Sequence, residues 1–194
     1  MLNCMICGVG GQGTVLASKL LAAAAMDAGL SVRTTETIGM AQRGGSVVSH
    51  VRMGETIFSP LIPLKQADII IAFEPAEAVR ALPYLREDGM MLVCDSAIKP
   101  VTDALSGGAY QAADMLAFLM KAVPAAKVLN GARIIEQCGV KALNVALLGA
   151  ALKTKLFPFG TEAMANVIRN KLPEKFQAMN LNALHLGGDM YEEQ

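Results

Sequence analysis

The sequence lacks an excess of charge of either sign. Lys and Arg together number 17 and Asp and Glu together number 17 among 194 residues, so the formal net charge at pH 7 is zero. A chain without a basic excess has no long-range field that attracts nucleic acid, and we expect no nucleic-acid partner. A basic amphipathic run is also missing, which argues against binding to a membrane surface.

Long apolar runs are missing as well. The apolar stretch near residues 143–152 is flanked by Lys141 and Lys153 and falls short of the ~20 residues that cross a bilayer. Residues 2–7 are apolar but lead straight into a glycine cluster and have no cationic leader, unlike a signal peptide. We therefore expect no membrane span and a cytoplasmic location.

The four cysteines lack the spacing of an iron–sulfur protein. Cys4 and Cys7 fall within a predicted strand, where residues three apart point to opposite faces, so they are not expected to share a metal or a disulfide. Burial in the core is the expected role of these two residues and of Cys94. The sequence thus predicts no metal site.

The chain does contain a regular alternation of apolar strands and helices. Strands are predicted at residues 2–8, 30–36, 45–53, 67–73, 89–95 and 126–131, with a further short strand at 56–62. Helices are predicted at residues 13–28, 75–86, 111–122 and through nearly all of the chain after residue 131, including one capped by Thr161. This order predicts an α/β, Rossmann-like fold with a mostly parallel, doubly wound sheet and a helical C-terminus. With no internal repeat or low-complexity linker, residues 1–194 are expected to form a single domain.

A glycine cluster lies between the first predicted strand and the first helix. Its members are Gly8, Gly10, Gly11, Gln12 and Gly13. In a G-x-G-x-x-G loop the first glycine permits a tight turn, the second lets the backbone approach an anion, and the third lets helix and strand pack closely. The helix N-terminus adds free N–H groups and the positive end of a dipole. Glu36 stands where a ribose-binding acid would stand.

The link between the second and third strands is too short for an ordinary dinucleotide fold. It is residues 37–44, TIGMAQRG, whereas a parallel crossover needs about a dozen residues. We expect an irregular or antiparallel pairing of these strands and an altered adenosine half-site. No second glycine fingerprint and no catalytic His–acid or Tyr–Lys group accompanies the loop. His50 and His185 lie in a predicted strand and in the last helix, where structural roles are favoured, so no catalytic residue is predicted.

The same link begins a second candidate cluster, composed of Gln42, Arg43, Gly44 and Gly45. Loops beyond the carboxyl ends of the strands line the binding crevice of an open α/β sheet, so this cluster and the glycine loop should share one edge. Arg43 is expected to contact a phosphate or carboxylate there, with a surface arginine on a turn as the alternative. A stand-alone NAD(P)-dependent oxidoreductase and a nucleotide-sensing module remain competing functions.

Longer motifs carry a family resemblance. They are GVGGQG, TTETIGMAQRGGSVVSHVRMG, SPLIP, ADIIIAFEPAEAVRALPYL, LNVALLGAAL and NLNALHLG, and they span nearly the whole chain. Together they resemble the gamma-type subunits of the 2-oxoacid:ferredoxin oxidoreductases. The MAQRGG form of the loop resembles the arylpyruvate branch, represented by the beta subunit of indolepyruvate:ferredoxin oxidoreductase.

The resemblance implies an enzyme subunit with no cofactor of its own. In this family thiamine diphosphate and the iron–sulfur clusters are bound mainly by a larger partner subunit. The holoenzyme decarboxylates a 2-oxoacid, passes electrons singly to ferredoxin and gives the acyl group to coenzyme A. This chain would complete the assembly and help shape the coenzyme A side of the active site, although the resemblance does not assign residues to that role.

Overall fold

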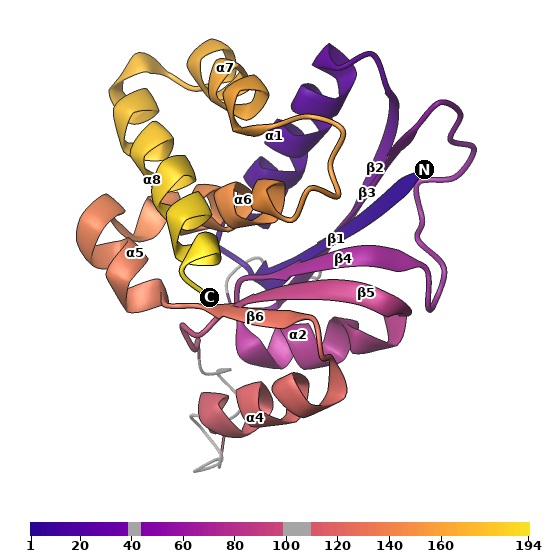
Figure 1. Cartoon of the computed structure of the whole chain (residues 1–194), viewed down its shortest axis with the longest axis vertical. Coiled ribbons are helices and arrows are strands. Elements are labelled where there is room, and N and C mark those ends of the chain that lie inside the picture. The colour runs from indigo at the N-terminus through magenta and orange to yellow at the C-terminus, as the bar shows by residue number, and fades with distance from the viewer. Residues whose placement is uncertain (39–43, 99–109) are drawn as a thin grey trace.

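A six-stranded sheet forms the centre of the molecule in the computed structural model, which describes residues 1–38, 44–98 and 110–194 (Figure 1). In spatial order the strands are β2 (Ser31–Ile38), β3 (Ser46–Gly54), β1 (Leu2–Val9), β4 (Ala67–Ala72), β5 (Leu85–Cys94) and β6 (Ala126–Leu129). β1, β4, β5 and β6 are parallel, and β3 is antiparallel to both β1 and β2. The predicted α/β sheet and the antiparallel pairing of its second and third strands are confirmed.

Helices cover both faces of the sheet (Figure 1). One face carries α1 (Thr14–Asp27), α5 (Gly131–Cys138), α6 (Leu143–Lys153), α7 (Thr161–Lys171) and α8 (Glu174–Glu192). The other carries α2 (Pro75–Ala81) and α4 (Ala112–Ala122). Short 3-10 turns, η1 (Leu82–Tyr84) and η2 (Val140–Ala142), follow α2 and α5. No single helix in the described ranges is both long and apolar enough to cross a membrane. The helical segments Gly131–Cys138 and Val140–Lys153 reach that length and apolarity only as a pair, and the pair is bent by 114°.

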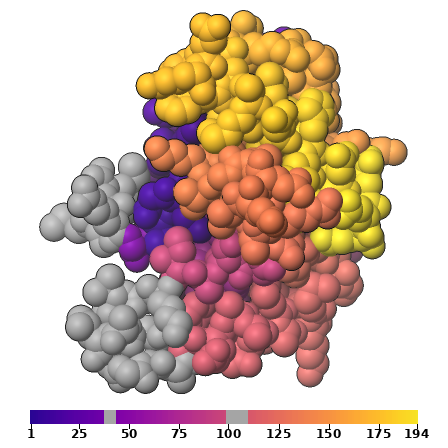
Figure 2. Space-filling view, turned by 90° about the vertical axis from the view of Figure 1, so that its left-hand side faces the viewer, coloured from indigo at the N-terminus to yellow at the C-terminus, as the bar shows by residue number. Residues whose placement is uncertain are grey.

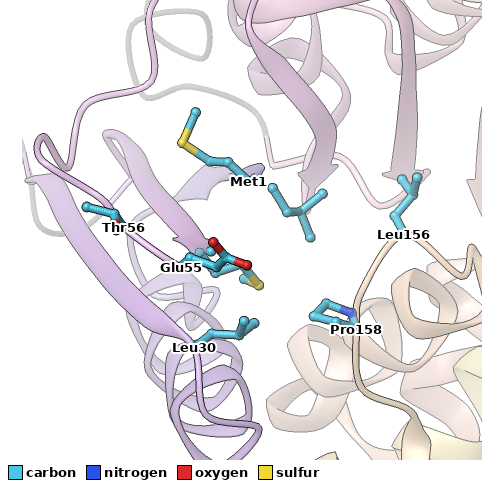
Figure 3. A pocket seen from close by; sticks show the side chains of 9 residues that line it. Met1, Leu30, Glu55, Thr56, Leu156 and Pro158 are labelled. Carbon is cyan, nitrogen blue, oxygen red and sulfur yellow. The ribbon is translucent and has the colours of Figure 1, made fainter.

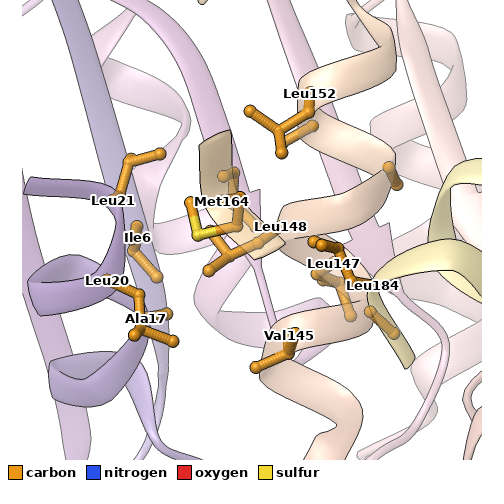
Figure 4. Packing of buried hydrophobic residues seen from close by; sticks show 14 of the residues in the cluster. Ile6, Ala17, Leu20, Leu21, Val145, Leu147, Leu148, Leu152, Met164 and Leu184 are labelled. Carbon is orange, nitrogen blue, oxygen red and sulfur yellow. The ribbon is translucent and has the colours of Figure 1, made fainter. Parts of the chain in front are cut away.

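The alternation of side chains along β1 separates two cores. Cys4 and Ile6 face α1 and α6, whereas Met5 and Cys7 face α2. Figure 4 shows Ile6 beside Leu20 on the side where α1 approaches α6. Both thiols are free and buried, and burial raises the pKa of each. The prediction that Cys4 and Cys7 point to opposite faces is confirmed.

Glycines bring α6 and α8 into backbone contact. A Cβ at Gly149 would overlap the carbonyl of Leu184, and a Cβ at Gly187 would overlap the carbonyl of Ala146. Such overlaps involve backbone atoms that cannot rotate away, so any larger residue would push the two helices apart. The crossing therefore fixes the position of α6, which carries a residue of the site described below.

The β3–β4 loop (residues 55–66) contains the first error of the sequence predictions, because residues 56–62 form no strand. Side chains of β3 satisfy its backbone instead. Arg52 Nη1 donates to the carbonyls of Ser59 at 2.9 Å and Leu61 at 3.1 Å. The N–H of Ile62 donates to Nδ1 of His50 at 3.2 Å. These bonds replace a β ladder, which the two prolines of the loop also disfavour.

Two helix boundaries also differ from the predictions. The helix predicted at 75–86 ends at Ala81, and a 3-10 turn containing Pro83 follows, because proline has no N–H for an α-helical bond. The chain then enters β5 at Leu85, four residues earlier than expected. Gly160, not Thr161, is the N-cap of α7, and it makes no side-chain capping bond.

Candidate functional site

The glycine loop lies at the edge where the parallel strands β1, β4, β5 and β6 end and where the antiparallel strand β3 begins. Figure 2 views the molecule from this edge and shows indigo atoms of the N-terminal segment between magenta and orange segments from later in the chain. Ligands of open α/β sheets bind beyond the carboxyl ends of the strands. The loop therefore stands where the sequence placed it.

Gln12 closes the glycine loop from inside. Its Oε1 accepts from the N–H of Val9 at 2.7 Å, and its Nε2 donates to the carbonyl of Phe73, just after β4, at 2.9 Å. A Cβ at Gly8 would lie 2.8 Å from that Oε1, so the first glycine makes room for the glutamine amide. Gln12 thus ties the loop to β1 and to the residue that follows β4.

Gly13 packs against helix α6, and not against the first strand as predicted. It is the N-cap of α1 with φ of 82°, and a Cβ there would lie 2.5 Å from Nδ2 of Asn144. That Nδ2 donates to the carbonyl of Gly13 at 3.2 Å, and Oδ1 accepts from the N–H of Val145 at 2.9 Å. Asn144 was not among the predicted site residues. A buried polar residue in an otherwise apolar helix was the available signal, because such a residue requires hydrogen-bond partners.

The structure joins the two predicted loops at one atom pair. The N–H of Gly10 donates to the carbonyl of Gly45 at 2.8 Å, and Gly44 has φ of 80°. The predicted close approach at Gly10 is therefore to the protein's own backbone, and this N–H is not free for an anion. The N–H groups of Gly11 and Gly13 find no acceptor among the described residues. Gln42 and Arg43 lie outside the described residues.

A cavity of about 500 Å³ adjoins the glycine loop, and we call it the amide cavity. Residues 10–12 and 96–97 line one part of it, and the apolar side chains of Ile98, Ile135, Val140 and Leu143 line the rest. No charged side chain lies among its described lining residues. Backbone amides and the N-terminus of α1 give this cavity a weakly positive character, which suits an anion.

A second cavity of about 290 Å³, the carboxylate cavity, shares Ile98 with the first. Glu74 and Glu77, both almost fully buried, line it together with Ser46 and Arg80. Glu77 accepts from Ser46 Oγ at 2.5 Å and pairs with Arg80. These carboxylates oppose the entry of an anion, so the two cavities differ in the ligands they favour.

Glu74 organises the wall of the carboxylate cavity. It caps α2, because its carboxylate accepts from the N–H of Ala76 at 2.7 Å and of Glu77 at 3.1 Å. Tyr110 donates its hydroxyl to the same carboxylate. Burial and the nearby charge raise the pKa of Tyr110, so this phenol remains protonated at neutral pH.

Three other residues considered in the sequence analysis, Glu36, His50 and His185, do not belong to the site. Glu36 accepts from Ser18 Oγ at 3.1 Å and is thereby tied to α1. His50 is buried in the sheet, where it contacts Tyr84 edge-on and burial lowers its pKa. His185 is exposed on α8. Within the described ranges, no three His, Cys, Asp or Glu side chains gather to hold a metal ion.

The fold and site define an α/β domain whose glycine loop is braced by its own side chains. Residues 3–190 match the family described as pyruvate ferredoxin/flavodoxin oxidoreductase. The chain belongs to this family, which confirms the resemblance noted in its sequence.

Relatives with curated names cover nearly all of the chain. A protein of Archaeoglobus fulgidus is 40% identical over 188 residues, which are 96% of this chain and 93% of that protein. A protein of Thermococcus kodakarensis is 36% identical over 188 residues, which are 95% of this chain and 93% of that protein. Both are named indolepyruvate oxidoreductase subunit IorB.

Solved structures share the fold at lower identity. The gamma subunit of a keto/oxoacid ferredoxin oxidoreductase from Geobacter sulfurreducens has a TM-score of 0.72 and 21% identity, and all of both chains is covered. The 2-oxoglutarate:ferredoxin oxidoreductase of Magnetococcus marinus has a TM-score of 0.74 and 20% identity, covering 100% of this chain but 31% of that one. The same fold thus occurs both as a separate chain and as part of a longer one.

Proposed function

We propose that this chain is the small subunit of an indolepyruvate:ferredoxin oxidoreductase. The observation that carries the proposal is the set of four relatives named as subunit IorB, which are 36–40% identical over at least 95% of this chain. Relatives named for pyruvate and ketoisovalerate enzymes are only 25–26% identical. The substrate of the assembled enzyme is therefore an arylpyruvate such as indolepyruvate.

The proposed division of labour places the cofactors on a larger partner subunit. Thiamine diphosphate there supplies the electron sink for decarboxylation of the 2-oxoacid, and iron–sulfur clusters carry single electrons to ferredoxin. This chain completes the coenzyme A side of the site and excludes water from it. Its free cysteines agree with that division, since Cys4 and Cys7 lie in separate cores.

The amide cavity is the proposed place for coenzyme A. Coenzyme A carries phosphates and a long pantetheine arm, and the cavity offers the amide of Gly11 beside an apolar wall. The carboxylate cavity is a poor place for phosphate because Glu74 and Glu77 line it. The proposal assigns the predicted residues 8, 10–13 and 42–45 to the side of the chain that faces coenzyme A or the partner.

A stand-alone NAD(P)-dependent enzyme is the less favoured function. The adenosine half of such a site needs a parallel β2–β3 crossover, and β3 is antiparallel here. Glu36, the candidate ribose-binding acid, is engaged by Ser18. One relative, from Aromatoleum evansii, is named NADH-dependent phenylglyoxylate dehydrogenase subunit gamma, but the match covers 35% of this chain.

Reconstitution tests the proposal. The chain alone, the large subunit alone and the two together are assayed for dye reduction by indolepyruvate with and without coenzyme A. We expect the chain alone to be colourless and inactive and the pair to show coenzyme A-dependent turnover. Equal activity of the large subunit with and without this chain would contradict the proposal, as would NAD(P)H-dependent activity of the chain alone.

Arg43 gives a residue-level test of the same edge. A charge-assisted bidentate contact is worth roughly 1.5–3 kcal/mol, or about 10- to 150-fold in an equilibrium. We expect Arg43→Ala to raise the Michaelis constant for coenzyme A, or weaken subunit binding, by this factor. Arg43→Lys should recover part of the loss because it keeps the charge without the planar fork. Equal behaviour of all three proteins would make Arg43 an ordinary surface residue.

A further inference from the structure

The end of the sheet opposite the glycine loop, where β1 and β4 begin and β3 ends, presents large apolar side chains. In the β3–β4 loop Phe58 is 94% exposed, Leu61 58% and Leu64 61%. Arg52 and His50 hold the loop in place by the backbone bonds described above. A loop that is already ordered loses little conformational entropy when it binds a partner. An exposed apolar patch of this kind marks a protein-binding surface.

A hollow of about 600 Å³ lies beside this loop, and we call it the edge hollow (Figure 3). Leu30, Leu156 and Pro158 give it apolar walls, and Glu55 and Thr56, the first two residues of the β3–β4 loop, line another side. Thr56 is two residues from Phe58, a separation of at most about 7 Å along an extended chain. One end of the molecule therefore carries both a protruding aromatic side chain and a cavity.

We propose that this end binds a second copy of the same chain, with Phe58 of each copy entering the edge hollow of the other. A two-fold interface uses one patch twice, so the patch must contain both partners of each contact. Its charges are also complementary: Glu55 lies at the hollow, and Lys65, exposed and opposite in sign, ends the protruding loop. The proposal pairs Glu55 of one copy with Lys65 of the other across the two-fold axis.

This inference goes beyond the proposed function and does not depend on it. The proposed coenzyme A edge is the opposite end of the strands, so a large subunit and a second copy can bind together. A buried Phe contributes roughly 150–250 Å², whereas a standard interface takes about 800 Å² from each partner. We therefore expect the dimer of the isolated chain to be weak, because one Phe side chain from each copy covers only a fraction of a standard interface.

Sedimentation equilibrium of the full chain, purified alone at about 1–100 µM, measures this association. We expect Phe58→Asp to raise the dissociation constant about 30-fold or more. Val140→Asp is the matched control, because Val140 is an apolar side chain, 66% exposed, at the other edge. Its dissociation constant should match that of the wild type, and both variants should keep the wild-type melting temperature.

Charge reversal identifies the two-fold contact. Glu55→Lys and Lys65→Glu should each weaken the dimer, and the double variant should recover its affinity because the pair is restored with opposite polarity. A wild-type chain that stays monomeric throughout the concentration range would overturn the proposal. A dimer whose dissociation constant is unchanged by Phe58→Asp would also overturn it. The same holds if Phe58→Asp abolishes binding of the large subunit and the wild-type chain shows no self-association, because the patch would then be the large subunit's.

Discussion

Two loops at opposite edges of the sheet are held in different ways. The glycine loop, residues 8–13, is braced by the neutral amides of Gln12 and Asn144. The β3–β4 loop is braced by the guanidinium of Arg52 and the imidazole of His50. Both braces satisfy backbone groups that would otherwise lose their hydrogen bonds. Only the second uses a charged side chain and an imidazole.

The difference fits the two proposals, an anion at one end of the strands and a second copy of the chain at the other. An edge that receives an anion through backbone amides gains from braces that neither compete as anions nor change charge with pH. An edge that contacts a protein has no such constraint, so charged side chains can hold it. We expect the glycine loop to be sensitive to shape and the β3–β4 loop to be sensitive to pH.

The largest effect is expected at Gly13. Gly13→Ala forces a side chain into a left-handed conformation and against Asn144, and we expect a loss of about 2–4 kcal/mol in the free energy of unfolding. Gly11→Ala is the control, because Gly11 has φ of 101° but nothing within 4 Å of a Cβ. It should cost about 1–2 kcal/mol. Chemical denaturation measures both, and equal losses would show that the Asn144 contact contributes nothing.

Gln12→Ala should have the next largest effect. It removes the acceptor for the N–H of Val9 and the donor to the carbonyl of Phe73. We expect a loss of about 1–3 kcal/mol in the free energy of unfolding, since the N–H is left buried without a partner. Gln111→Ala, an exposed residue whose side chain makes no capping bond, is the control. A loss below the control's would mean that water replaces the glutamine amide.

Arg52→Ala tests the opposite edge. It removes two bonds to loop carbonyls, and we expect a loss of about 1–2 kcal/mol because the guanidinium is partly exposed. The neighbouring Arg33 of β2, an exposed residue paired with Arg52 in the sheet register, is the control, and its replacement by Ala should be nearly neutral. Hydrogen exchange of the β3–β4 loop should rise in the first variant only.

The smallest effect is a pH dependence at His50. Burial lowers the pKa of this imidazole from its ordinary value of 6.5, so the unfolded chain binds the proton more readily. Its contribution to stability is complete above pH 6.5 and is lost as the pH falls from there through the folded-state pKa. The slope is at most about 1.4 kcal/mol per pH unit. His50→Gln should flatten this dependence between pH 7 and the lower limit of folding, and His185→Gln should not.

The sheet could be predicted because its signals are local. Apolar runs at residues 69–72 and 90–94 mark the buried parts of β4 and β5, and the eight-residue link between β2 and β3 excludes a crossover helix on length alone. The loop at 56–62 could not be predicted in the same way. Its apolar residues match a strand, and the side chains that replace the ladder, Arg52 and His50, come from the preceding strand.

The position of the glycine loop could be predicted from the sequence, but the contacts that hold the loop in place could not. A glycine pattern identifies the loop, yet it does not reveal that Gly10 meets the carbonyl of Gly45 or that Gly13 faces Asn144. Asn144 is 131 residues from Gly13 in the chain, a separation across which no periodicity carries information. The glutamine at position 12 was recognised as part of the loop, but its bond to Phe73 depends on the neighbouring strand.

The close crossing of α6 and α8 has a consequence for synthesis on the ribosome. Asn144 holds the glycine loop from α6, and α6 is positioned by α8, which touches it through Gly149 and Gly187. The glycine loop, residues 8–13, therefore takes one of its braces from a helix whose own position depends on residues 174–192, much later in the chain. In a nascent chain Gln12 can close the loop once β4 has formed. We expect Asn144 to take its final position against Gly13 only after α8 has left the exit tunnel and packed on α6.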